Sequence, residues 1–267
     1  MKKRTLFGLG VLLVLSTSLA ACGKESQAQT QKEEGKVITV GTGNAYRPFV
    51  YLDENNELQG YDVEVMKEID KKLPDYQFKY ESMDFKNILT ALSAGKVDFA
   101  GHQYEYNDER AKKYLYGKVG YTDYTLYIAA NKDASTYTSL DTLAGKKVFT
   151  SPGSNAAYLL EQYNQNHSTK IDIVYNEATQ EVLVKGLQNG TADAALLTKY
   201  DVDKLNKEFS AELVTNTKPI NESKTYFVFK KGDQELADKV DKALQELIDE
   251  GKLSELSKKI LGADYTK

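Results

Sequence analysis

One short pattern occurs twice in this chain, with its two copies roughly 100 residues apart, which is the length of a lobe. Residues 92–98 (LSAGKVD) and 187–193 (LQNGTAD) both read Leu-x-x-Gly-x-x-Asp. In each copy an apolar helical stripe ends, a glycine follows as a left-handed cap, and a new strand begins. The repeat therefore predicts two lobes of the same architecture and not a solenoid of small units. A single such match could arise by chance in any α/β protein.

Further echoes accompany this repeat. Residues 147–150 (KVFT) resemble residues 36–39 (KVIT), and residues 155–158 (NAAY) resemble residues 44–46 (NAY). Matches that recur in the same order make chance a weaker explanation. The length of 267 residues allows two lobes of roughly 100–130 residues, each large enough for its own core.

Short strand patterns alternate with helical ones, which indicates βα units around a mostly parallel sheet. We expect strands near residues 37–40, 76–80 and 97–100, and helices on the apolar stripes Val63, Met66, Ile69, Leu73 and Phe85, Ile88, Leu89, Leu92. Asp84 is the expected N-cap of the second helix, and Gly95 lies just past its end.

The C-terminal segment contains one more strand pattern, at residues 225–229, and a helical stripe that ends at Gly251. This segment is too short for a third lobe, so we expect it to return to the first. The chain would then cross between lobes near residues 122–128 and 218–225, which predicts a hinge and a ligand cleft.

The N-terminus has the pattern of an export signal. Lys2, Lys3 and Arg4 precede an apolar run at residues 6–15, which is too short to span a membrane. The following Leu-Ala-Ala-Cys ends at Cys22, the single cysteine of the chain, and is similar to the lipobox of bacterial lipoproteins. In that motif the thiol is lipidated and the cysteine becomes the first residue. An ordinary secretory signal with a chance cysteine, or a buried free thiol, is the alternative.

These patterns predict that the chain is divided into a signal peptide at residues 1–21, a flexible tether at 22–36, a first lobe at 37–124 and 222–267, and a second lobe at 125–221.

One cysteine excludes an internal disulfide and a multi-cysteine metal site. The net charge of −4 gives no reason to expect a nucleic-acid partner.

Motifs of known enzyme classes are missing from the sequence. Gly153-Ser154-Asn155 lacks the frame of a nucleophile elbow, and Gly41-Thr42-Gly43 is not followed by a phosphate-loop lysine. His102 and His167 lie far apart and predict no metal pair, so each is expected at the surface or behind a site. We therefore expect no catalysis, no cofactor and no metal.

Several segments together resemble the family 3 solute-binding proteins of amino-acid ABC importers. The matching segments are residues 40–49, 58–63, 92–98, 107–110, 140–148, 187–194 and 251–253. The resemblance implies an α/β fold of the two-lobed periplasmic-binding-protein type (type II), with two Rossmann-like lobes joined by a two-strand hinge. It further implies a monomer that captures an extracellular amino acid and delivers it to a membrane permease.

The resemblance also assigns roles to residues that would hold the ligand carboxylate. Arg110, in Asn-Asp-Glu-Arg, matches the arginine that clamps the carboxylate, which suits a planar guanidinium. Gly153, Ser154 and Asn155 match the loop at the start of a second-lobe helix, where free N–H groups would hold the same carboxylate. The alternatives are an exposed helical arginine and a plain helix cap.

Other positions would serve the side chain and the ammonium group of the ligand. Tyr46 and Phe85 match an aromatic pair that encloses the ligand side chain, with core packing as the alternative. Many family members carry an aspartate where this chain has Thr198, and a hydroxyl cannot supply that negative charge. We hypothesise that Glu105 takes over the ammonium contact and that Thr198 assists.

The segment at residues 102–110, which includes Gln103, is further similar to a Gram-positive subgroup that binds cystine and related sulfur amino acids. The expectation is a lipid-anchored protein on the outer face of a Gram-positive cell membrane, with L-cystine as ligand. Another polar or cationic amino acid remains open as the ligand. A cleft dehydratase of the same fold, and an adhesin or sensor role, also remain open.

Overall fold

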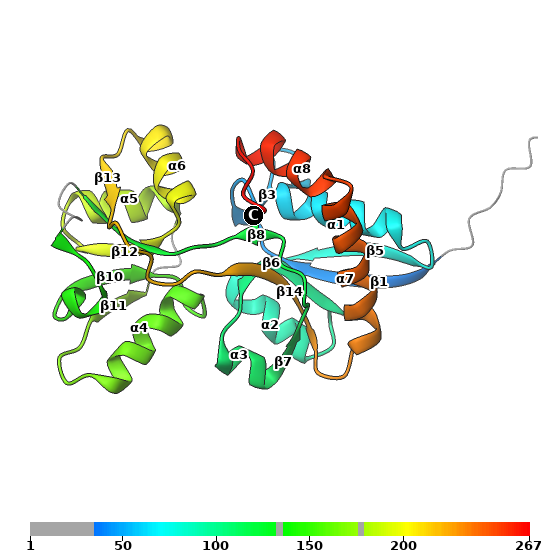
Figure 1. The fold of residues 1–267 in the computed structure, drawn as a ribbon, viewed down its shortest axis with the longest axis horizontal. Coiled ribbons are helices and arrows are strands. Elements are labelled where there is room, and N and C mark those ends of the chain that lie inside the picture. Colours follow the sequence, from blue (N-terminus) through cyan, green and yellow to red (C-terminus); the bar gives the residue numbers. More distant parts are fainter. Residues whose placement is uncertain (1–34, 132–135, 176–178) are drawn as a thin grey trace, which may run out of the picture. The chain divides into compact units, whose positions relative to one another are not determined.

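A computed structural model describes residues 35–131, 136–175 and 179–267 as a mixed α/β fold with two main sheets (Figure 1). The predicted signal peptide, Cys22 and the tether up to residue 34 lie outside these residues. None of the helices described is both long and apolar enough to cross a membrane.

The first sheet has the strand order β5-β1-β6-β14-β7, with β8 paired to β14. Strand β1 (Lys36–Thr42) pairs in parallel with β5 (Tyr76–Ser82) and β6 (Phe99–Glu105). Strand β14 (Lys224–Lys230) runs antiparallel to β6, β7 (Tyr114–Tyr116) and β8 (Thr122–Asp123). We call the part of the chain built on this sheet the first lobe.

The second sheet has the order β11-β10-β12-β9-β13. Strand β10 (Lys147–Thr150) pairs in parallel with β11 (Asp172–Tyr175) and with the central strand β12 (Ala194–Leu197). Strand β9 (Tyr127–Asn131) is antiparallel to β12 and to β13 (Leu213–Thr215). We call the part built on this sheet the second lobe. A third, small sheet contains β2 (Ala45–Tyr46), β3 (Val50–Leu52) and β4 (Leu58–Gln59).

The two aspartates of the sequence repeat do the same work in the two lobes. Asp98 Oδ2 accepts a hydrogen bond from Thr39 N at 2.7 Å, and Asp193 Oδ2 accepts one from Lys147 N at 2.8 Å. Each aspartate thereby fixes the strand that follows it, β6 or β12, to the neighbouring parallel strand, β1 or β10. The predicted duplication of architecture is confirmed, and Gly95 and Gly190 have positive φ angles of 70° and 75° as the cap requires.

The additional echoes in the sequence are not structural equivalents. Val40 pairs with the residue after Asp98, and Val148 pairs with the residue after Asp193, so residues 39–42 correspond to residues 147–150. The alignment of residues 36–39 with 147–150 is therefore wrong by three residues, because the aspartate bond and not the Lys-Val pair sets the register. The match of residues 44–46 with 155–158 is also wrong, since one lies at a hairpin strand and the other in a helix.

Helices of the first lobe bury the apolar stripes that the sequence predicts. Helix α1 (Tyr61–Lys72) buries Val63, Met66 and Ile69, and α2 (Phe85–Ser93) buries Ile88 and Leu92. Asp84 is the N-cap of α2 by position, yet its side chain makes no capping hydrogen bond. Helix α3 (Asp108–Lys113) follows β6 directly.

Chain from both ends of the first lobe shares one core. Residues of α7 (Gln234–Asp249) and α8 (Lys252–Leu261) pack in the same buried cluster as Ile38 and Val40 of β1. The predicted return of the C-terminal segment to the first lobe is confirmed. In the second lobe, α4 (Asn155–Asn166), α5 (Gln180–Gln188) and α6 (Lys199–Phe209) cover two further clusters, and the 3-10 helix η2 (Leu140–Leu143) precedes β10.

The two segments that cross between the lobes hydrogen-bond to one another. Leu126 N donates to Asn221 O at 2.8 Å, and Ile220 N donates to Leu126 O at 2.7 Å. Tyr124 N donates to Ser223 O at 2.8 Å. The predicted crossings near residues 122–128 and 218–225 therefore exist and form a paired two-strand connection.

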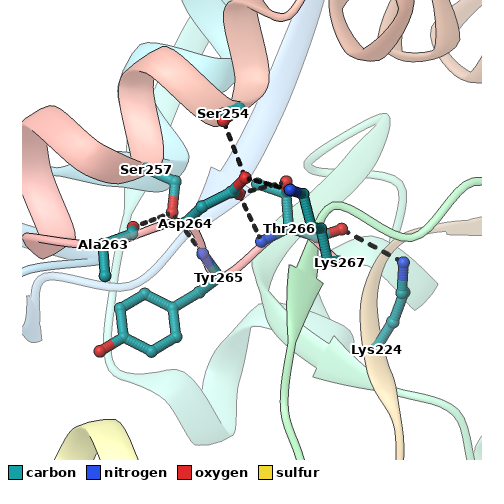
Figure 2. A network of polar contacts seen from close by, with 8 residues as sticks. All are labelled: Lys224, Ser254, Ser257, Ala263, Asp264, Tyr265, Thr266 and Lys267. Atoms are coloured by element: carbon teal, nitrogen blue, oxygen red, sulfur yellow. Dashed lines mark hydrogen bonds and ion pairs between the residues drawn. The ribbon is translucent and has the colours of Figure 1, made fainter.

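The C-terminal tail is fastened beside the start of this connection (Figure 2). The Ser257 hydroxyl donates to Ala263 O at 2.7 Å and accepts from Tyr265 N at 2.9 Å. Lys224 Nζ donates to Thr266 O at 3.2 Å, and Tyr265 O accepts from Asp123 N at 2.6 Å. Because Asp123 ends β8 and Lys224 begins β14, the tail is bonded to both strands at the point where they leave the first lobe.

Candidate functional site

Glu105 is a buried carboxylate at the end of β6, where the chain leaves the first sheet. Its residue is 4% exposed, and Oε1 accepts a hydrogen bond from Asn155 Nδ2 of the second lobe at 3.1 Å. The Asn221 side chain, from a crossing segment, also bonds to it. Burial raises the pKa of Glu105 to about 8, while the Asn155 bond and the charge of Arg110 oppose the shift.

Arg110 lies on α3, whose first turn is capped by the Asn107 side chain at 2.8 Å. Its Nη1 donates to the main-chain oxygen of Glu105 at 2.8 Å, and its Nη2 donates to Gly153 O of the second lobe at 2.8 Å. The Tyr104 ring lies 5.0 Å from the guanidinium carbon. The guanidinium is thus held in one orientation between the two lobes.

The N-terminus of α4 supplies the second-lobe half of this contact. Gly153 has a φ of +75°, Ser154 is the N-cap, and the helix begins at Asn155. The Ser154 hydroxyl accepts from Ala157 N at 3.0 Å, as a helix cap does. Asn155 instead reaches across the lobes, to Glu105 and to the Asn107 side chain.

Thr198 and Asp201 form a capping box at the start of α6. Thr198 Oγ1 donates to Asp201 Oδ2 at 2.6 Å and accepts from Asp201 N at 3.0 Å. Asp201 Oδ1 accepts a hydrogen bond from the first-lobe Tyr46 hydroxyl at 3.2 Å, and that hydroxyl is 2.9 Å from the Tyr124 hydroxyl. Asp201 is not among the residues predicted from the sequence, although Thr-x-x-Asp before an apolar run is a capping-box signal.

The aromatic residues Tyr46 and Phe85 both contact one imidazole. The His102 ring centroid is 4.9 Å from that of Phe85 and 5.9 Å from that of Tyr46. His102 is buried against Tyr46 and Phe85, which is the second of the two positions expected for it, and burial lowers its pKa to about 3, which keeps the ring neutral. Tyr46 and Phe85 are each half-buried. His167 is exposed.

Gln103 makes its side-chain contacts inside the first lobe. Its Nε2 donates to Asp62 Oδ1 at 2.5 Å and to Thr122 Oγ1 at 3.3 Å, and its backbone φ is +47°. Burial raises the pKa of Asp62 to about 7. The Gln103 amide is therefore committed to Asp62, while Glu105, two residues along the same strand, is bonded across the lobes.

The structure brings most of the residues singled out in the sequence into two groups. Glu105, Arg110, Gly153 and Asn155 contact one another between the lobes. Tyr46 and Thr198 meet through Asp201. A guanidinium, a helix N-terminus and buried carboxylates are the groups that a zwitterionic ligand requires. No three His, Cys, Asp or Glu side chains gather as metal ligands within residues 35–131, 136–175 and 179–267.

Comparison with known families agrees with this geometry. The model of the bacterial extracellular solute-binding proteins, family 3, matches residues 38–263. The chain belongs to this family. The two lobes and the paired crossing segments are accordingly those of an extracellular solute-binding protein.

Similar proteins of this family occur in Bacillus subtilis and Listeria monocytogenes. The L-cystine-binding protein TcyK of Bacillus subtilis is 40% identical over 268 residues, covering 100% of this chain and 99% of the relative. The L-cystine-binding protein TcyJ of the same organism is 38% identical over 259 residues, covering 97% and 96%. A solved structure, named as a candidate L-cystine ABC transporter from Listeria monocytogenes, is 41% identical with a TM-score of 0.80, covering 87% of this chain and 98% of that one.

Proposed function

We propose that this protein is the substrate-binding lipoprotein of an ABC importer that captures L-cystine, or a related sulfur amino acid, between its two lobes. It then delivers the ligand unchanged to a permease in the membrane. The bonds from Arg110 to Gly153 and from Asn155 to Glu105 carry the proposal, because they place a cation and a carboxylate between the lobes. The names of the two Bacillus relatives support cystine as the ligand.

Each part of the amino-acid group has a partner in this proposal. Arg110 binds the carboxylate, with the N–H groups of Gly153 and Asn155 facing it from the second lobe. The Ser154 N–H donates to Ser151 O at 3.2 Å, so Ser154 contributes as the cap of this helix end. Glu105 binds the ammonium group, and Thr198 acts indirectly by holding Asp201. Tyr46 and Phe85 flank the ligand side chain. Gln103 acts by fixing the backbone at its positive φ just before Glu105.

Binding in this geometry favours the closed arrangement of the lobes. A ligand that contacts Arg110 on the first lobe and the α4 N-terminus on the second is bound more tightly when both contacts exist together. Differential affinity of this kind is what shifts a population between conformations. We place the lobe boundaries at residues 37–124 with 222–267, and 125–221.

Isothermal calorimetry on residues 23–267 tests this function. Titration with L-cystine is expected to give one site per chain, and glutamine and arginine are expected to bind at least roughly tenfold more weakly. Glu105→Gln is expected to weaken cystine binding, with Glu109→Gln on the exposed face of α3 as the control. Heat from glutamine or arginine but none from cystine would show that cystine is not the ligand. Unchanged cystine affinity in Glu105→Gln would contradict the role of Glu105 in binding the ammonium group.

We further propose that Cys22 carries a diacylglyceryl anchor on the outer face of a Gram-positive cell membrane and that the protein is a monomer. Two acyl chains provide stable anchoring, whereas one gives reversible binding. Expression of the full chain with labelled palmitate is expected to label the protein, and Cys22→Ala is expected to remove the label and release the protein into the medium. A labelled Cys22→Ala variant would contradict the anchor.

A further inference from the structure

Each lobe contributes one buried carboxylate that is hydrogen-bonded to a residue outside its own lobe. Glu105, from the first lobe, is 4% exposed, and Asp201, from the second lobe, is 5% exposed. Their hydrogen-bond donors are neutral: amides for Glu105, and the Thr198 and Tyr46 hydroxyls for Asp201. Burial raises the pKa of both groups.

The cations nearest to these carboxylates are engaged elsewhere. The two Arg110 Nη atoms donate to the main-chain oxygens of Glu105 and Gly153. Lys204, whose charge lowers the pKa of Asp201, directs Nζ to Arg47 O at 2.7 Å and to Gln180 Oε1 at 2.5 Å. A buried carboxylate with neutral partners alone is costly to ionise, so each of these two has capacity for a further cation.

Tyr124 connects the two carboxylates. It lies in a crossing segment, its hydroxyl is 2.9 Å from that of Tyr46, and Tyr46 donates to Asp201. Asn221, whose side chain bonds to Glu105, lies on the other crossing segment, and Leu126 N donates to Asn221 O at 2.8 Å two residues beyond Tyr124. Both carboxylates therefore contact groups that connect to the same pair of crossing segments.

We infer that Glu105 and Asp201 form a pair that binds the two ammonium groups of one diamino dicarboxylic acid, one carboxylate on each lobe. This inference rests on the proposed function and adds a residue and a selection rule to it. Arg110 and Glu105 bind one amino-acid head, and Asp201 binds the ammonium of the other. A ligand with one ammonium group leaves Asp201 buried without a cation, so such a ligand binds more weakly.

Calorimetry with two disulfides of similar length tests the pair. L-cystine carries two ammonium groups, and the mixed disulfide of L-cysteine with 3-mercaptopropionic acid carries one. Wild-type protein is expected to bind L-cystine at least roughly tenfold more tightly than the mixed disulfide. Asp201→Asn is expected to remove most of this preference by weakening L-cystine alone. Glu105→Gln is expected to weaken both ligands, because Glu105 serves the head that they share.

Asp203→Asn is the control on the same helix, α6. Asp203 is exposed, so its variant removes a carboxylate charge outside the site, and we expect the melting temperature and the preference for L-cystine both to be retained. Equal wild-type affinity for the two disulfides would overturn the inference while leaving the proposed function intact, and this comparison needs no variant. Absence of L-cystine binding to wild-type protein would instead overturn the proposed function.

Discussion

Arg110 and Gly153 are joined across the two lobes by a hydrogen bond of 2.8 Å from a guanidinium Nη2 to a main-chain oxygen. The other Nη atom donates to the oxygen of Glu105 on its own lobe. The Arg110 guanidinium thus hydrogen-bonds to both lobes at the same time. A planar fork with two donor atoms is needed for this, and the ammonium group of a lysine offers one donor atom.

Arg110→Lys is therefore expected to weaken L-cystine binding by at least roughly tenfold, since a charge-assisted hydrogen bond contributes about 1.5–3 kcal/mol. Calorimetry measures the affinity, and circular dichroism checks the fold. Arg47→Lys is the matched control, because Arg47 is exposed and its Nη2 contacts Leu52 O at 3.4 Å. Equal losses in the two variants would contradict a specific role for Arg110.

Ligand affinity is expected to rise with pH between about pH 6 and pH 7.5. Burial raises the pKa of Glu105 to about 8, so the ligand-free site holds a proton there below that pH. An ammonium group favours the ionised carboxylate, and binding therefore releases a proton. Each ionising group contributes at most about tenfold in affinity per pH unit.

Calorimetry in buffers of different ionisation enthalpy counts the released protons. Glu105→Gln is expected to reduce both the proton release and the pH dependence, because the amide has no proton to lose. Proton uptake on binding by the wild-type protein would be incompatible with the assigned state of Glu105.

Asp62 and Gln103 predict a different pH effect, on stability. In the part of the chain that the structure describes, Asp62 Oδ2 and Gln103 Oε1 have no hydrogen-bond partner, although Gln103 Nε2 donates to Asp62 Oδ1. An ionised Asp62 would therefore keep one buried oxygen without a donor, which favours the protonated acid. Burial accordingly raises the pKa of Asp62 to about 7, above the ordinary value of 3.8.

The folded state then holds a proton that the unfolded chain loses, so the free energy of unfolding falls as pH rises from about 4 to 7 and levels off above. The slope is at most about 1.4 kcal/mol per pH unit for this group. Asp62→Asn is expected to remove this slope, because an amide mimics the protonated acid. Its free energy of unfolding relative to that of the wild-type protein is therefore expected to be most favourable at pH 8. Urea unfolding at several pH values measures this free energy, with the exposed Asp172→Asn as control. An unchanged slope in Asp62→Asn would refute the assignment.

Ser257→Ala is expected to lower the free energy of unfolding by about 1–3 kcal/mol, because it leaves Ala263 O and Tyr265 N without their partner. Ser254→Ala is the matched control, since the Asp264 carboxylate that it contacts also accepts from Thr266. We expect Ser257→Ala to speed hydrogen exchange at Asp123, which the tail holds through Tyr265 O. Equal destabilisation by the two variants would count against a tail held mainly by Ser257.

The fold could be predicted from sequence where a local signal and a packing role coincide. Asp98 and Asp193 end a helix-glycine-strand pattern, and each also fixes its strand to the neighbouring parallel strand, so the repeat can be recognised in the sequence. The register was misjudged by three residues because Lys-Val recurs next to the true equivalents. Likewise Asp84 has the right position for a cap but does not use its side chain.

The site was less accessible to sequence reasoning, because its partners meet only after the lobes fold. Nothing local indicates that Asn155 bonds Glu105, fifty positions earlier in the chain. Asp201 lies one helical turn beyond Thr198, and the capping-box pattern suggests a local role, whereas its second oxygen faces Tyr46 of the other lobe. Gln103 was grouped with Glu105 by sequence proximity, and its amide is bonded to Asp62.

Native mass spectrometry of residues 23–267 with an equimolar mixture of L-cystine, glutamine, arginine and glutamate tests the central claim most directly. The account predicts one ligand per chain, with the mass of L-cystine, recovered chemically unchanged after the protein is denatured. A different amino acid in the complex, or a ligand recovered as a reaction product, would contradict it.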